Sequence, residues 1–213
     1  MNLFKKILSL LFKKKKKIRL ALYGPPNSGK TTLTKRIIRD LSDLSEKEIN
    51  DLVDSPIPHE TREIKIKRNI KLKIKKKEFD FDLIDTPGIS TKIDYEEFLE
   101  YGMNEEEAKE RALEATKGVV EAIKFLDNVD AALVVLDSTK NPYDQINITI
   151  VGNLDAKKIP FFIVANKIDL KESSVEKIKS VFPQYKVVPI SAKEGINMEE
   201  FYEELAKLIK NVK

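Results

Sequence analysis

The stretch GPPNSGKT, from Gly24 to Thr31, decides the fold of this chain. It follows an apolar stretch, Ile18 to Tyr23, that reads as a strand, and it precedes a stretch to about Leu41 whose apolar residues recur at helical spacing. A strand, a loop with this glycine spacing and a helix form a phosphate-binding loop, because backbone N–H groups of the loop and helix N-terminus point at an anion. The stretch therefore predicts an α/β protein that binds a nucleotide.

The polar residues of this loop have separate expected roles. Lys30 reaches the outer phosphates and the Thr31 hydroxyl coordinates Mg²⁺, while the glycines let the backbone approach the ligand closely. The phosphate-binding set expected from the stretch is Gly24, Asn27, Ser28, Gly29, Lys30, Thr31 and Thr32.

A second motif, LIDTPG, places Asp85 at the end of an apolar strand. A carboxylate there suits the hydration shell of Mg²⁺, and the Gly88 N–H is positioned to contact a γ-phosphate. The order of this motif after the phosphate-binding loop makes the nucleotide prediction stronger.

Two further motifs, NKID from Asn166 and SAK from Ser191 to Lys193, each follow an apolar strand. The Asp169 carboxylate can accept from N1–H and the 2-amino group of guanine, whereas adenine offers neither donor, so the site should select GTP over ATP. We expect Asn166 to brace the loops, Lys167 to lay its stem along the base and the Ala192 N–H to meet the guanine O6.

The rest of the chain alternates short apolar strands with helical patterns, which indicates a sheet with helices on both faces. Period-2 alternation predicts a strand pair over 64–74 and 79–84, with lysines along its solvent face that protect an edge strand or, alternatively, bind RNA. A long helix should begin after Asn104, which forms a capping box with Glu107. Further strands are predicted at 131–136, 161–165 and 187–190, and further helices near 143–156, 173–182 and 197–211.

Composition confines the positive charge to one end of the chain. The formal net charge is +4, yet the first twenty residues hold eight bases and no acid, and the rest holds 31 bases against 35 acids. The body therefore lacks the basic balance of a dedicated nucleic-acid domain. The chain has no cysteine, which excludes disulfides and thiol chemistry and fits a cytoplasmic protein.

The ordered set GPPNSGKT, HETRE, DTPG, NKID and SAK resembles the Ras-like P-loop GTPases, and the details of GPPNSGKT and HETRE are similar to the Era-like branch. The resemblance covers residues 17–213. It implies a three-layer G domain whose six-stranded, mostly parallel sheet has one antiparallel edge strand. It also implies that Thr61 is the switch I threonine, which meets Mg²⁺ with Thr31 and Asp85. Because the chain stops after the last G-domain helix, we expect it to lack the C-terminal RNA-binding module of Era.

Two long segments are expected to respond to the γ-phosphate. Residues 42–59 are interpreted as switch I and residues 90–103 as an extended switch II, for which a plain surface helix around 95–101 is the alternative. The single histidine, His59, is interpreted as a solvated loop residue and not as a catalytic base.

Hydrolysis is expected to be slow without help. Ras-like enzymes orient the attacking water with a glutamine where this chain has Ile89. Era-like relatives with such a replacement often bind K⁺ through the asparagine that corresponds to Asn27. The alternative is that Asn27 only braces the loop. Arg62 or a partner protein are other sources of positive charge. The expected catalytic residues are Lys30, Thr61, Asn27 and Gly88.

The opening residues, MNLFKKILSLLFKKKKK, predict an amphipathic helix followed by a polybasic run, so residues 1–16 form an appendage to the G domain of 17–213. Their apolar part is roughly 15 Å long as a helix, too short for a hydrocarbon core of about 30 Å, so it should lie in the interface. The arrangement is similar to the N-terminal helices of Arf and Sar GTPases. Binding of residues 1–17 to anionic lipid is the leading interpretation, followed by packing on the G domain or a protein partner, and then by nucleic-acid contact.

The leading functional hypothesis is a GTP/GDP switch, peripheral on the cytoplasmic face of the membrane, that uses Mg²⁺ and is stimulated by K⁺. The alternatives are an RNA-directed or ribosome-assembly GTPase and a slow-turnover scaffold that recruits a partner. The effector, the activating protein and a GTP-dependent dimer across the switches stay open.

Overall fold

The computed structural model describes residues 18–41, 45, 47–49, 65–74, 77–89, 96, 99 and 102–212. Its elements, in chain order, are β1 (Ile18–Tyr23), α2 (Lys30–Leu41), β2 (Lys65–Ile74), β3 (Lys77–Asp85), α5 (Glu105–Lys124), the 3₁₀ turn η1 (Phe125–Asn128), β4 (Ala131–Asp137), α6 (Gln145–Ala156), β5 (Phe161–Asn166), α7 (Val175–Val181), β6 (Val187–Pro189) and α8 (Met198–Asn211).

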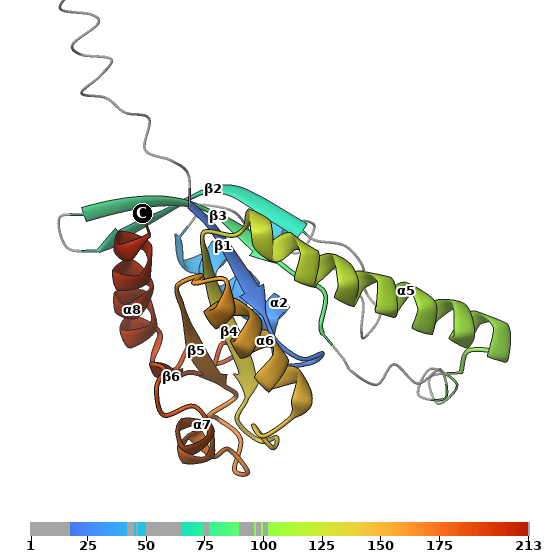
Figure 1. Ribbon diagram of the computed structural model, residues 1–213. Coiled ribbons are helices and arrows are strands. Elements are labelled where there is room, and N and C mark those ends of the chain that lie inside the picture. The colour runs from blue at the N-terminus through green and yellow to red at the C-terminus, as the bar shows by residue number, and fades with distance from the viewer. Residues whose placement is uncertain are drawn as a thin grey trace, which may run out of the picture.

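The strands form one sheet in the order β2-β3-β1-β4-β5-β6 (Figure 1). Strand β1 pairs in parallel with β3 and β4, and β5 continues the parallel set between β4 and β6. Strand β2 lies at the edge, antiparallel to β3. The predicted sheet, mostly parallel with one antiparallel edge strand, is thus confirmed. Because the carboxyl ends of parallel strands share one edge, the loops after β1, β3, β5 and β6 gather there.

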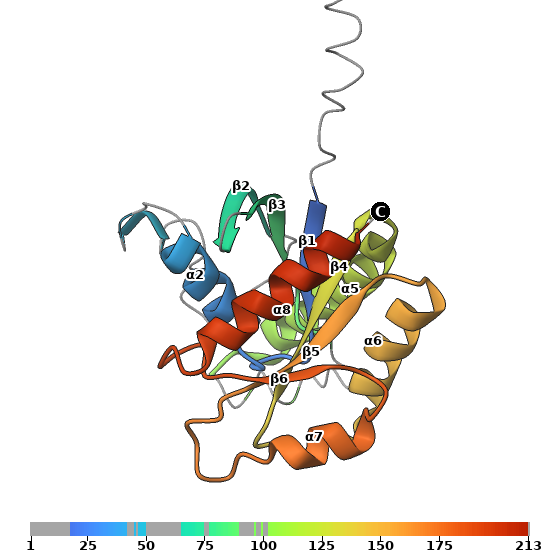
Figure 2. The same cartoon turned by 90° about the vertical axis from the view of Figure 1, so that its left-hand side faces the viewer.

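Helices cover both faces of this sheet (Figure 2). Side chains of β1 alternate between two cores, as the period of a strand requires. Leu20 and Leu22 pack with α2 and α8, whereas Ala21 and Tyr23 pack with α5, α6 and α7. Both cores therefore meet in the strand that leads into the phosphate-binding loop, which fixes the position of that loop from two sides.

The element boundaries agree with the sequence-based predictions to within two residues. The predicted capping box of α5 is confirmed as well. The Asn104 side chain accepts from the Glu107 backbone N–H at 2.9 Å, and the Glu107 carboxylate accepts from the Asn104 N–H at 3.2 Å. Local hydrogen bonding of this kind satisfies N–H groups that the first helical turn leaves without a partner.

The register of β2 against β3 corrects one prediction. Lys67 lies opposite Leu83 and Ile70 lies opposite Phe81, so β2 has one more residue than β3 over this interval. Such a bulge moves the side chains that follow it to the other face of the sheet. Ile66 is consequently exposed while Ile70 is buried. The expectation of one continuous row of lysines on the solvent face is wrong for the part of β2 before the bulge.

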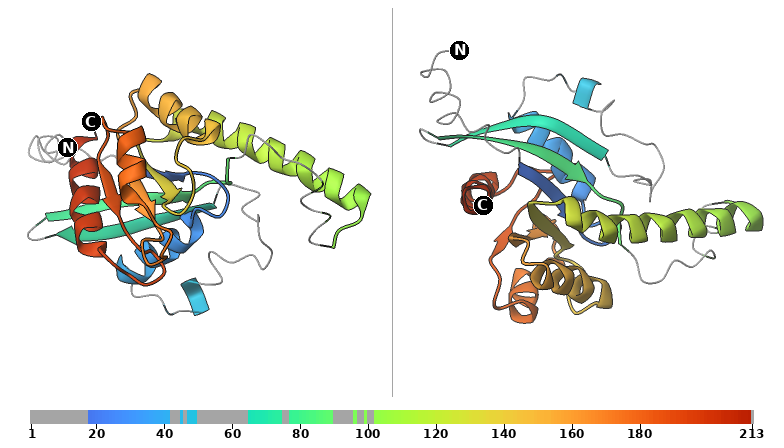
Figure 3. Two further views of the ribbon diagram at one scale, coloured as in Figure 1. Left: turned by 90° about the horizontal axis from the view of Figure 1, so that it is seen from below. Right: turned by 45° about the horizontal axis from the view of Figure 1, so that its top comes forward.

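Helix α5 extends well beyond the sheet, as both views in Figure 3 show. Two of its apolar side chains, Leu113 and Val120, are exposed. Within the ranges described above, no helix has both the length and the apolar character needed to cross a membrane. The amphipathic helix predicted for residues 1–16 lies outside the described residues.

Candidate nucleotide-binding site

The loop between β1 and α2 wraps the side chain of Lys30, the first residue of α2. The Lys30 Nζ donates to the carbonyl of Gly24 at 3.0 Å and to that of Pro25 at 2.8 Å. Only 6% of Lys30 is exposed. Burial lowers its pKa to about 8, although the charge of Asp85 acts in the opposite direction. A cation is therefore held inside the loop, where the outer phosphates of a nucleotide would meet it.

Asp85, the last residue of β3, lies beside the start of α2. The Thr31 hydroxyl donates to Asp85 Oδ2 at 2.9 Å, and the carboxylate is buried. A hydroxyl and a carboxylate side by side form the hard oxygen donor set that Mg²⁺ prefers. Ser28 Oγ is also buried and has no hydrogen-bond partner within the described residues, as expected of a group that a bound ligand would satisfy. The residues present thus fit a Mg²⁺–nucleotide complex.

The DTPG segment packs directly on the phosphate-binding loop. The Thr86 hydroxyl donates to the Leu22 carbonyl at 2.6 Å, and the Ile89 N–H donates to the Gly24 carbonyl at 3.2 Å. Gly88 approaches so closely that an added Cβ would lie 2.8 Å from Pro26 Cα. The structure brings the two predicted phosphate-contacting segments together.

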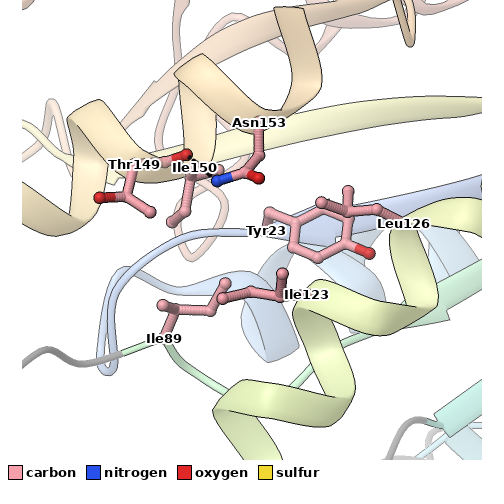
Figure 4. A pocket seen from close by; sticks show the side chains of 7 residues that line it. All are labelled: Tyr23, Ile89, Ile123, Leu126, Thr149, Ile150 and Asn153. Carbon is pink, nitrogen blue, oxygen red and sulfur yellow. Dashed lines mark hydrogen bonds between the residues drawn. The ribbon is translucent and has the colours of Figure 1, made fainter. Parts of the chain in front are cut away.

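Ile89 does not face the loop with its side chain. It is buried in an apolar pocket that Tyr23, α5, η1 and α6 line (Figure 4). Its neighbours there include Ile123 and Ile150. The position at which Ras-like enzymes carry a water-orienting glutamine therefore contributes packing between helices here.

The base-binding motifs meet the phosphate-binding loop through Asn166. The Asn166 Nδ2 donates to the Ser28 carbonyl at 2.9 Å, and its Oδ1 accepts from the Ala192 N–H at 3.0 Å. The prediction that Asn166 braces the loops is consistent with this geometry. In this structure the Ala192 N–H, expected to meet guanine O6, donates to Asn166. The Asp169 carboxylate is exposed at the same edge of the sheet.

One contributor at this edge was missed from the sequence. Asp137, the last residue of β4, accepts from Lys167 Nζ at 2.6 Å and from the Thr139 hydroxyl at 2.7 Å. Burial acts to raise the pKa of Asp137, but the hydrogen bonds from Lys167 and Thr139 outweigh it and lower that pKa. The pair holds the lysine stem in place. An acid at the carboxyl end of a central strand is the signal that could have found it.

The SAK segment forms a short closed loop after β6. Ser191 is buried, and its hydroxyl accepts from the Glu194 N–H at 3.1 Å. Lys193 is exposed beside it. The predicted Thr61 lies outside the described residues, as do His59, Arg62 and most of switch I and of the extended switch II, so their expected roles stay predictions.

We predict that Lys30→Met stabilises the nucleotide-free protein at pH 7, by on the order of 1 kcal/mol, because it removes a buried charge. Since folding lowers the Lys30 pKa from 10.5 to about 8, the unfolded chain binds more protons between these pH values. Wild-type stability should therefore rise with pH through this window, and the advantage of the variant should shrink.

Urea unfolding at pH 7 and pH 10 measures this difference, with the exposed Lys177→Met as the control. The variant should also lose phosphate binding. A variant that is less stable than wild type by the same amount at both pH values would contradict the account of Lys30.

Comparison with known proteins supports the same assignment. A model of the 50S ribosome-binding GTPase family matches residues 19–167. The GTPase Der of Bacteroides thetaiotaomicron is 27% identical over 164 residues, which are 77% of this chain and 31% of that protein. The tRNA modification GTPase MnmE of Pseudothermotoga lettingae is 29% identical over 199 residues, 92% of this chain and 36% of that protein. The chain thus spans about a third of the length of these relatives.

Solved structures share the fold. Era of Aquifex aeolicus bound to GDP and AlF4⁻ superposes with a TM-score of 0.63 at 21% identity, covering 89% of this chain and 56% of that one. The elongation factor SelB of Methanococcus maripaludis has a TM-score of 0.60 at 20% identity, covering 93% of this chain and 35% of that one. The family match extends over more than half of the chain, from β1 to the NK of NKID. The chain belongs to the 50S ribosome-binding GTPase family, whose members bind and hydrolyse GTP.

Proposed function

We propose that this protein is an Era-like GTP/GDP switch that hydrolyses GTP slowly on its own and acts at an anionic membrane surface. The observation that carries the GTP-binding part of the proposal is the link through Asn166, which joins the phosphate-binding loop to the SAK loop. A single buried amide thus connects the parts that would hold the phosphates and the base. Thr31 and Asp85, with Thr61 from switch I, would hold Mg²⁺, which neutralises phosphate charge when bound.

Slow intrinsic turnover follows from the position of Ile89. A buried isoleucine side chain cannot orient water, so another group must supply order and positive charge at the transition state. Asn27 is exposed in the phosphate-binding loop, at a left-handed backbone angle (φ 57°). Its side-chain carbonyl is available to a monovalent cation, and we propose that K⁺ bound there stimulates hydrolysis.

GTP hydrolysis measured in KCl and in NaCl tests this role. We expect a rate about tenfold or more higher in KCl, the order that one added charge-stabilising group provides. Asn27→Ala should abolish the K⁺ response, whereas Asn211→Ala at the exposed end of α8 should keep it. Equal rates in the two salts would exclude K⁺ as the activating ion.

The proposed membrane contact is compatible with nucleotide exchange. Strand β1 begins at Ile18, directly after the polybasic run, and ends at Tyr23, directly before the phosphate-binding loop. The start of β1, which residues 1–17 precede in sequence, and the nucleotide site are therefore at opposite ends of this strand, roughly 20 Å apart. Lys13 to Lys17 would each contribute about 1 kcal/mol near an anionic surface. A lipid-bound N-terminus leaves the nucleotide site accessible.

Flotation with vesicles of phosphatidylcholine and phosphatidylserine tests the anchor. The full chain is compared with one that starts at Ile18, each loaded with GDP or a non-hydrolysable GTP analogue. We expect only the full chain to float, more with the analogue, and weakly on phosphatidylcholine alone. If the shortened chain floats equally, or if neither floats, the anchor is not residues 1–17.

A second candidate function is action on ribosomal RNA. The matching family is described as ribosome-binding, and one Era structure with a TM-score of 0.61 at 24% identity was solved with a segment of 16S ribosomal RNA. The bases of residues 1–17 would then contact phosphates of the RNA. Retention of ribosomal RNA by the full chain, lost when residues 1–17 are removed and without flotation, would favour this function.

A further inference from the structure

The SAK loop touches helix α2 through a glycine and an arginine. Gly195 has φ +75°, and a Cβ added to it would lie 2.6 Å from Arg36 Nη1, 2.5 Å from Nη2 and 2.7 Å from Cζ. Three atoms of one planar group at nearly equal distances indicate that the guanidinium lies with its face over Gly195. A side chain at position 195 would occupy the space that Arg36 fills.

Arg36 is held in this orientation by two neighbours. Its Nε donates to Asp40 Oδ2 at 2.9 Å, one turn along α2. The same carboxylate oxygen accepts from the Tyr202 hydroxyl of α8 at 2.8 Å. Burial, and then the charge and hydrogen bond of Asp40, raise the pKa of Tyr202, so its hydroxyl stays a donor. These bonds orient the guanidinium between α2 and α8, on a side chain that is about one quarter exposed.

Backbone hydrogen bonds link Gly195 to the rest of the SAK loop. The Gly195 N–H donates to the Ser191 carbonyl at 2.8 Å, and the backbones of Ser191 and Ile196 exchange two hydrogen bonds of 3.2 Å. Ala192 lies inside this closed loop, and its N–H meets Asn166 Oδ1 at 3.0 Å. Because these hydrogen bonds close the loop around Ala192, a displacement of the loop at Gly195 would also move the Ala192 N–H.

These contacts close a ring around the nucleotide site. One half runs from Ser28 through Asn166 to Ala192, and the other runs along α2 from Lys30 to Arg36 and across to Gly195. We infer that Arg36 and Gly195 are positioning residues for guanine recognition, which set the distance between the phosphate-binding loop and the SAK loop. This inference rests on the proposed contact of the SAK loop with guanine.

Affinities of the full chain for GDP, ADP and inorganic pyrophosphate, measured by calorimetry, test the inference. Arg36→Ala should weaken GDP binding about tenfold, the equivalent of one hydrogen bond, because the SAK loop loses the guanidinium that stacks on Gly195. Binding of ADP and pyrophosphate should not change, since their contacts lie on the phosphate-binding loop. The preference for GDP over ADP should fall accordingly.

Arg39→Ala is the matched control. Arg39 is exposed on the same helix, so both substitutions remove an arginine from α2, and only Arg36→Ala removes the contact with Gly195. We expect Arg39→Ala to bind all three ligands like wild type.

The inference is overturned if Arg36→Ala keeps the wild-type preference for GDP over ADP, or if it loses GDP and pyrophosphate affinity equally. Arg36→Lys keeps the charge and loses the planar group, so it should also weaken GDP binding without weakening pyrophosphate binding. A wild-type protein that binds ADP as tightly as GDP would instead refute the proposed function itself.

Discussion

The Asn166 side chain is the interaction on which the rest of the site depends. It is one amide with a donor and an acceptor, and it uses both, toward the Ser28 carbonyl and the Ala192 N–H. Because Asn166 is buried, its removal would leave two backbone groups without partners in a low-dielectric interior, at a cost of about 1–3 kcal/mol for each. Its position follows from the sheet: β5 ends level with β4 and next to β6, so the loops after these strands meet at Asn166.

Near this link, the site buries charged side chains, and the burial of a charge lowers the stability of the folded chain. Lys30 is buried among carbonyls, and Asp85 is buried against the Thr31 hydroxyl. Buried charges of this kind oppose folding, because removing them from water costs free energy that their hydrogen bonds only partly offset. The two cores that converge on β1 supply the stability that the site lacks. Ile89 contributes to this stability as well, because its buried side chain connects the DTPG segment to the core between α5 and α6.

Much of this could be predicted from sequence because the decisive signals are local. The phosphate-binding loop, the strand and helix periods and the capping box of α5 depend on neighbouring residues, and each agrees with the structure. The bulge in β2 was missed, although Arg68 and Asn69 interrupt the Lys/Ile alternation at that place. A polar residue in an alternating strand is equally compatible with an unbroken register, so this interruption alone does not indicate an extra residue. The partnership of Asp137 with Lys167 and the stacking of Arg36 on Gly195 were missed for another reason. They join residues far apart in sequence, and only the order of strands brings them together.

The central claim is that the loops joined by Asn166 read guanine, and one measurement tests it most directly. Affinities for GDP and for xanthosine diphosphate, which carries a carbonyl in place of the 2-amino group, are compared between wild type and Asp169→Asn. Since a carboxylate accepts from the 2-amino group and an amide can donate to the carbonyl, the account predicts that wild type prefers GDP and that the variant prefers xanthosine diphosphate. An Asp169→Asn protein that keeps the wild-type preference for GDP would contradict it.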